Sequence, residues 1–174
     1  GTNVTIIEMA DRLVTAEEPE ISKRLAEQLG KRMRIITGMR VTSLEQQKNR
    51  VEVTARSTQD DSGHSFRAER VLVALGRTPN TDTLQVDKAG LRITENGFID
   101  VDAHMRTSQD GVYAIGDING KHMFMHVANV EALVAAANAF DESDIAMDYP
   151  AAPHAVYSSP QIAGVGLTEA EAKE

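Results

Sequence analysis

The chain has 174 residues, 41% of them hydrophobic, which is enough apolar material for a folded core and argues against general disorder. Its 26 acidic and 18 basic residues give a net charge of −8 spread along the chain; nucleic acid and anionic membranes, which need concentrated basic patches, are therefore not expected partners. No apolar run is long enough to cross a bilayer and the first residues do not form a signal peptide, so we expect a soluble, cytoplasmic protein.

The N-terminal part of the chain predicts a strand, a helix and a second strand. Val4–Ile7 is a β-branched run that stops at the acidic Glu8, which is typical of a buried parallel strand with a carboxylate at its end. Apolar residues at helical spacing follow Pro19, and Gly30 closes that helix before the second strand at Arg34–Thr37. This order is half of a doubly wound α/β unit.

The middle of the chain changes its hydrophobic period. Val41–Leu44, Val51–Ala55 and Ser65–Ala68 alternate apolar and polar residues, which predicts an antiparallel meander with one solvated face. Val71–Leu75 is then continuously apolar and ends at Gly76. We expect it to be a strand buried on both faces, where the chain returns to the parallel sheet.

A second structural unit is expected to begin near Thr78. A turn is predicted at Asn96-Gly97, with short strands at Phe98–Val101 and Gly111–Ile115. The Ala-rich segment Val127–Phe140 predicts a helix packed against something large.

That helix is expected to present Val130, Leu133 and Val134 on one buried face. Beyond it, Asp148–Pro153 has the composition of a linker. The last predicted elements are strands at Val156-Tyr157 and Ile162–Val165 and a capping box, Thr168 to Glu171, that opens a helix.

Glu8 is the first candidate binding residue. A dinucleotide-binding fold places an acid at such a strand end to bind both hydroxyls of the adenosine ribose. A carboxylate there would repel a 2′-phosphate, so the position favours NAD over NADP. The alternative is a solvated glutamate that simply ends a strand, and the glycine fingerprint that would decide between them is not among these residues.

Asp117 is the second candidate, at the end of the predicted strand Gly111–Ile115. Gly116 leaves room for a ligand chain while the Asp117 carboxylate accepts a hydrogen bond from a ligand hydroxyl. The alternative is a strand that ends in a Gly-Asp turn with no binding role. The helix predicted at Val127 favours binding, because a helix N-terminus offers free N–H groups to an electron-rich ligand.

No catalytic or metal site is predicted. The sequence has no cysteine, which excludes disulfides and a catalytic thiol within these residues. The five histidines lack metal-ligand spacing, and only His122 and His126 stand four apart. For His126, a capping or surface role is favoured over proton transfer.

Five motifs together resemble the pyridine nucleotide-disulfide oxidoreductases, in their order and over nearly the whole chain. They are Val4 to Glu8, Val71 to Asn80, Gly97-Phe98-Ile99 with Arg106-Thr107, Val112 to Ile118, and Ser159 to Glu169.

The resemblance implies a part of an enzyme that uses both NAD and FAD. Residues 1–77 would be an incomplete doubly wound NAD-binding domain with its meander, residues 78–147 part of an FAD-binding domain, and residues 148–174 the start of an α+β dimerisation domain.

The resemblance also assigns roles to seven residues. Glu8 would take the NAD adenosine ribose, Val41 would lie beside the adenine, and Gly76 with Arg77 would close the NAD site. Asp117 would bind the ribityl hydroxyls of FAD. Met125 and His126 would approach the flavin ring through their backbone.

The family passes electrons between NAD(H), flavin and a cysteine pair that acts on a dithiol or disulfide, usually as a homodimer. Neither that pair nor the sheet's central first strand lies in this chain. The chain alone is therefore expected to be inactive, to bind cofactors poorly, and to dimerise, rearrange its sheet or be marginally stable. The alternatives are a mercuric reductase, an NADH oxidase or transhydrogenase relative, and a non-catalytic binding or assembly module.

Overall fold

The computed structural model describes every residue of the chain except Glu142 and Ala151. Contacts between Cα atoms divide it into two compact units. The first unit comprises Gly1–Ala74 and Ala155–Glu174, and the second comprises Leu75–His154. The predicted linker at 148–153 lies in the second unit, and its Ala151 is outside the described residues.

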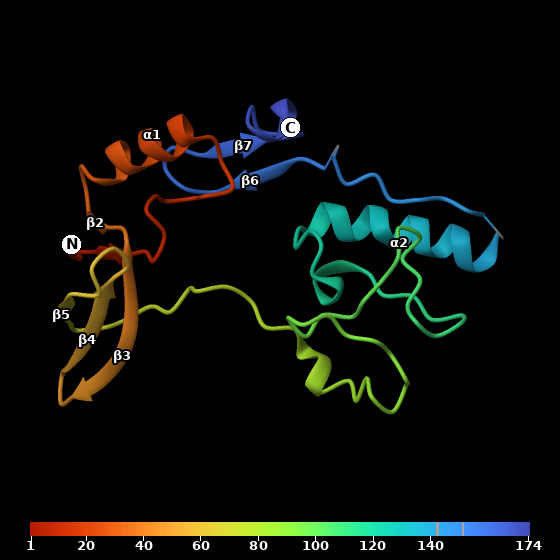
Figure 1. Cartoon of the computed structure of the whole chain (residues 1–174), viewed down its shortest axis with the longest axis horizontal. Helices are drawn as coiled ribbons and strands as arrows, with labels where there is room; N and C mark the ends of the chain where they lie inside the picture. Colours follow the sequence, from red (N-terminus) through yellow and green to blue (C-terminus); the bar gives the residue numbers. More distant parts are fainter. Residues whose placement is uncertain (142, 151) are drawn as a thin grey trace. The chain divides into compact units, whose positions relative to one another are not determined.

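The first unit begins with the predicted strand, helix and strand (Figure 1). β1 (Thr5–Ile7) pairs in parallel with β2 (Arg34–Ile36), with Ile6 opposite Ile35. The parallel arrangement is confirmed, whereas the predicted burial is not, because Thr5 is exposed and both isoleucines of β1 are only half-buried. Two paired strands cannot cover both faces of one another, so β1 keeps solvent contact.

The helix α1 (Pro19–Leu29) connects these strands. Pro19 lies in its first turn and Gly30 is its C-cap, as expected. Ser22 and Leu25 face inward: the Ser22 hydroxyl donates to the Leu13 carbonyl, and Leu25 packs in a core cluster with Leu13 and Ile162.

The meander is confirmed as a three-stranded antiparallel sheet of order β3-β4-β5. Its strands are β3 (Met39–Gln47), β4 (Arg50–Ser57) and β5 (Gly63–Ala68). Val53 and Ala55 of the central strand are buried, so one face packs inward. A bulge between Val41 and Ser43 interrupts the β3 register.

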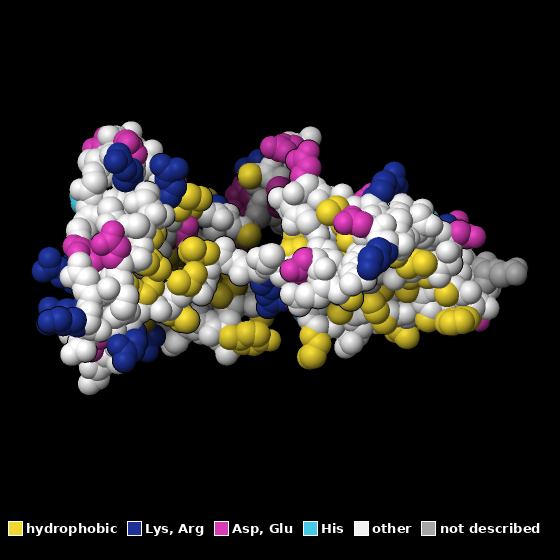
Figure 2. All heavy atoms as spheres, turned by 90° about the horizontal axis from the view of Figure 1, so that it is seen from below, with side chains coloured by type: hydrophobic (Ala, Val, Ile, Leu, Met, Phe, Trp, Pro, Cys, Tyr) yellow, Lys and Arg dark blue, Asp and Glu magenta, His cyan; other side chains and the backbone are white. Residues whose placement is uncertain are grey.

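The strand predicted at Val71–Leu75 does not form. The segment has no strand pairing, and Leu72 and Leu75 are 89% and 86% exposed. A strand requires hydrogen-bonding neighbours, and the parallel sheet in the described residues consists of β1 and β2 alone. Apolar side chains consequently reach the surface, as they do elsewhere in both units (Figure 2).

A two-stranded sheet is formed near the C-terminus by β6 (His154–Val156) and β7 (Ile162–Gly164), which belong to the first unit from Ala155 onward. α1 lies beside it (Figure 1), and Ile162 belongs to the same core cluster as Leu25. The capping box is confirmed by reciprocal hydrogen bonds between Thr168 and Glu171, which also lower the pKa of Glu171. The element it opens is a short 3-10 helix, Glu171–Lys173.

The second unit is built around one long helix, α2 (Met125–Phe140), which confirms the helix predicted there (Figure 1). The two strands predicted before it are reduced to single bridges, Ile93 with Ile99 and Arg106 with Tyr113. Their other backbone hydrogen bonds do not extend these bridges into strands: the Asp102 N–H donates within a turn to the Arg106 carbonyl, and the Ile99 N–H donates to the Ile118 carbonyl. The buried core of the unit is formed by Val86, Ile99, Val101, Met105, Ala114, Val134 and Ala135.

The buried face of α2 differs from the predicted one. Val134 is buried, but Val130 and Leu133 are 48% and 72% exposed. The residues that face inward are Val127, Glu131, Val134, Ala135 and Asn138. The helix is apolar nearly all round, so hydrophobicity alone does not identify the face that packs. No helix in the described part of the chain is long and apolar enough to span a membrane.

Gly120 provides a direct test of packing in the second unit. Its φ is 72°, and a Cβ there would lie 2.5 Å from the Phe98 ring. We expect Gly120→Ala to destabilise the unit by about 1–2 kcal/mol for the left-handed backbone and about 1–3 kcal/mol more for the clash. Gly111→Ala is the control, because Gly111 has a φ of 70° and open space around it. Equal losses of unfolding free energy in the two variants, measured by urea denaturation, would show that the Phe98 ring does not restrict position 120.

Candidate functional site

Glu8 lies at the carboxyl end of the parallel β1-β2 pair, as predicted. Its N–H donates to the Ile36 carbonyl and its carbonyl accepts from the Met39 N–H, both at 2.9 Å. Oε1 of its carboxylate accepts a hydrogen bond from the Ala10 N–H at 2.9 Å. The carboxylate is therefore fixed at the point where the sheet ends and β3 begins, with Val41 two residues further along β3.

Asp117 lies in the short 3-10 helix Gly116–Asn119, which we call the Asp117 turn. Its carboxylate forms an ion pair with the Arg77 guanidinium. The two side chains are 52% and 62% exposed, so a ligand can reach both. Gly76, immediately before Arg77, is exposed and has a φ of 129° with open space around it.

The N-terminus of α2 lies against the Asp117 turn. The two elements are in contact, and a Cβ on Gly116 would come within 3.3 Å of the Ala128 Cβ, so glycine, at a φ of 73°, favours this approach. No side chain caps α2, which leaves its first N–H groups without intrahelical partners. Met125 is 82% exposed at this end. The first N–H groups of α2 are therefore available as hydrogen-bond donors beside the Asp117 turn, whose carboxylate is an acceptor.

The His126 side chain is hydrogen-bonded to the protein backbone. Its Nε2 lies 2.7 Å from the Pro153 carbonyl oxygen, and its ring stacks on Phe124 with centroids 5.5 Å apart. His122 stacks instead on Tyr149, at 4.8 Å. Among the described residues, no group of three acidic, histidine or cysteine side chains could hold a metal ion.

The structure thus brings the seven predicted residues into two groups. Glu8 and Val41 belong to the first unit, at the β1 end and on β3. The second unit contains the other five: Gly76, Arg77, Asp117, Met125 and His126. Arg77, expected to help close the NAD site, here contacts the acid expected to bind FAD.

Glu131 is a prominent residue that the sequence analysis did not single out. It is fully buried on α2 and accepts hydrogen bonds from the Gly116 N–H, the Asn119 amide and the Tyr149 hydroxyl. Burial raises the pKa of the Tyr149 hydroxyl above its usual range, and the hydrogen bond to the Glu131 carboxylate raises it further. A signal existed in the sequence, because Glu131 is the single charged residue in Val127–Phe140.

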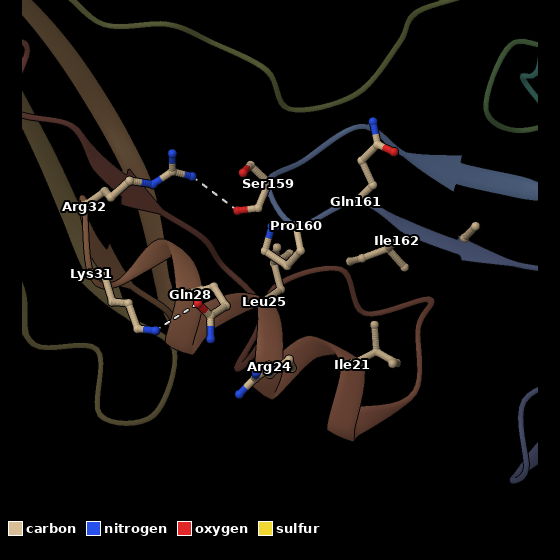
Figure 3. Close-up of a pocket in the computed structure, with 11 residues that line it drawn as sticks. Ile21, Arg24, Leu25, Gln28, Lys31, Arg32, Ser159, Pro160, Gln161 and Ile162 are labelled. Carbon is tan, nitrogen blue, oxygen red and sulfur yellow. Dashed lines mark hydrogen bonds between the residues drawn. The ribbon is translucent and has the colours of Figure 1, made fainter.

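A groove of about 780 Å³ lies elsewhere in the first unit, between α1 and the turn joining β6 to β7 (Figure 3). Its floor includes Leu25 and Pro160. Two of its cations are hydrogen-bonded within the protein: Arg32 donates across the groove to the Ser159 carbonyl at 3.2 Å, and Lys31 donates to Gln28 at 2.9 Å. None of the seven predicted residues lines it, so we assign it to the packing of the turn on α1.

Relatives of known sequence resemble the whole chain. Dihydrolipoyl dehydrogenases from Thermus scotoductus and Haloferax volcanii are 38% and 37% identical to it, each over 100% of the chain. The chain spans only 38% and 37% of the length of these relatives.

Solved structures also match nearly the whole length of the chain. The Cu(II) complex of the HOCl-induced flavoprotein disulfide reductase RclA from Escherichia coli has a TM-score of 0.86 and 27% identity, covering 99% of this chain and 38% of RclA. LpdA from Mycobacterium tuberculosis also has a TM-score of 0.86, with 25% identity, covering 97% of this chain and 36% of LpdA. The α/β fold is that of flavoprotein disulfide reductases.

A family model described as pyridine nucleotide-disulphide oxidoreductase matches residues 1–132. This match covers β1 to β5 and the first half of α2, and therefore includes every predicted site residue. The chain belongs to the pyridine nucleotide-disulphide oxidoreductase family.

Proposed function

We propose that the chain is a segment of an FAD- and NAD-dependent disulfide oxidoreductase that resembles dihydrolipoyl dehydrogenase. The observation that carries the proposal is the placement of two carboxylates, Glu8 and Asp117. One ends a parallel strand and the other stands beside an uncapped helix N-terminus. Both are arrangements that suit the sugar hydroxyls of a dinucleotide.

In this proposal the first unit holds NAD. Glu8 has one carboxylate oxygen bound to the Ala10 N–H, which fixes the side chain, and its remaining acceptor positions would accept from ligand hydroxyls. Its charge would repel a 2′-phosphate, and Val41 would border the adenine. Residues 1–77 would then correspond to the partial NAD-binding domain.

The second unit would hold FAD, and its residues fit that role. Asp117 would accept hydrogen bonds from the ribityl hydroxyls, and the backbone N–H groups of Met125 and His126 would donate to the flavin ring. The Arg77 guanidinium neutralises Asp117 and holds it at the surface. FAD would supply the hydride and electron transfer, whereas residues 78–147 bind and orient it.

The parent enzyme would move electrons between NAD(H), flavin and a dithiol or disulfide substrate as a cytoplasmic homodimer. The 174 residues contain no cysteine, so the redox-active pair of such a parent would lie outside them, and we expect the chain alone to be inactive in disulfide reduction. In the parent, residues 148–174 would begin the dimerisation domain.

Glu8→Ala tests the nucleotide proposal. We expect NAD binding by the chain, measured by calorimetric titration, to weaken about ten- to a hundredfold because a charge-assisted hydrogen bond is lost. The preference for NAD over NADP should fall as well. Glu20→Ala is the matched control, since it removes an equal charge from the first turn of α1. The assignment fails if both variants bind NAD as the unmodified chain does.

A further inference from the structure

The buried carboxylate of Glu131 connects three segments of the second unit. It projects from α2 and is 0% exposed. One oxygen, Oε2, accepts from the Gly116 N–H and from Asn119 Nδ2, the latter at 3.1 Å. The other, Oε1, accepts from the Tyr149 hydroxyl at 2.6 Å. No ligand can reach this side chain, so any role it has in binding must be exerted through its neighbours.

Two of those neighbours are the ends of the Asp117 turn. Gly116 begins the turn and Asn119 ends it, and Asp117 lies between them. Asn119 Oδ1 in addition accepts from the Lys121 N–H at 2.9 Å, which continues the network into the chain that leads to α2. The two anchors leave the Asp117 backbone little freedom, because both ends of a four-residue turn are bonded to one rigid helix.

A buried charge is retained here although it is expensive to desolvate. An apolar side chain would pack against Val134 and Ala135 at lower cost, but it could not accept hydrogen bonds from the buried Gly116 N–H and Asn119 amide. The described residues contain no buried side-chain nitrogen or oxygen without a hydrogen-bond partner. The carboxylate itself accepts from the Gly116 N–H and the Asn119 amide.

We propose that Glu131 is a positioning residue: it fixes the Asp117 turn on α2 and so sets the direction in which Asp117 meets ligand hydroxyls. The inference rests on the proposed function, because it deepens the assignment of Asp117 to FAD. The Tyr149 hydroxyl donates to Oε1, the other oxygen of the carboxylate, and so helps to fix the Glu131 side chain while Oε2 accepts from the turn.

Amide hydrogen exchange followed by NMR tests this arrangement. In Glu131→Ala, exchange at Gly116 is expected to rise about ten- to a hundredfold relative to amides inside α2, because the turn opens locally. Glu131→Gln should restore protection to within about threefold, since its oxygen still accepts from the turn and its amide donates to Tyr149.

Asn138→Ala is the matched control. Asn138 is buried on the same face of α2 but bonds the backbone of His104 and Ile145. It should destabilise the unit without selectively exposing Gly116. Equal loss of protection throughout the unit in both variants would overturn the positioning role.

FAD titration separates this inference from the proposed function. Glu131→Ala should weaken FAD binding about tenfold, and adding Asp117→Ala should cause no further loss, because the two residues act as one unit. Selective opening of the turn with unchanged FAD affinity would overturn the inference. If Asp117→Ala alone binds FAD as tightly as the unmodified chain, the proposed role of Asp117 fails, whereas the exchange comparison still decides whether Glu131 fixes the turn.

Discussion

Met105→Ala is expected to lower the free energy of unfolding of the second unit by about 2–5 kcal/mol. Met105 is 0% exposed at the centre of the core cluster, where it packs with Val101, Ala114 and Val134. The Tyr149 hydroxyl also contacts its sulfur at 3.7 Å. Truncation would remove apolar contacts and leave a cavity that the loops around it cannot fill. Urea denaturation followed by circular dichroism measures the loss.

Met125→Ala is the control for this prediction. It makes the same chemical change in the same unit, but at a side chain that is 82% exposed. Its effect should stay within about 0.5 kcal/mol. Comparable losses in the two variants would show that the observed core does not stabilise the second unit.

Replacing Leu72 and Leu75 together with lysine is expected to abolish most self-association of the chain. The two side chains are 89% and 86% exposed in a segment that has no strand partner. Burying both in a contact between copies would contribute about 3–6 kcal/mol, so the association constant should fall about a hundredfold or more. Sedimentation equilibrium over a range of concentrations measures that constant.

Leu167→Lys serves as the comparison, because Leu167 is also exposed, at 65%, and lies outside this segment. It should leave the association constant nearly unchanged. A chain that is monomeric at every concentration, or equal effects of the two substitutions, would show that Val71–Leu75 does not drive association.

Local pattern predicted much of the fold. The period of two in β3, β4 and β5 and the apolar spacing after Pro19 identify elements whose partners are close in sequence. Val71–Leu75 has an equally strong strand pattern, yet it is not a strand here. A strand depends on neighbours to which it can hydrogen-bond, and composition does not supply them.

The candidate site was predictable to a similar degree. Glu8 and Asp117 could be singled out because each acid follows an apolar run, and the structure places Glu8 at the end of the parallel pair. The ion pair of Arg77 with Asp117 joins residues forty positions apart and could not be read from local pattern. Glu131 was missed because an acid in a helix is ordinarily a solvated one.

In the proposed function, each unit contributes its own dinucleotide site. A two-dimensional NMR spectrum of the chain, titrated separately with NAD and with FAD, tests it most directly. NAD should shift the amides of Ile7–Ala10 and Met39–Val41, and FAD those of Gly116–Gly120 and Met125–Ala128. If both cofactors shift the same residues, or only those around the groove between α1 and the β6-β7 turn, the account is contradicted.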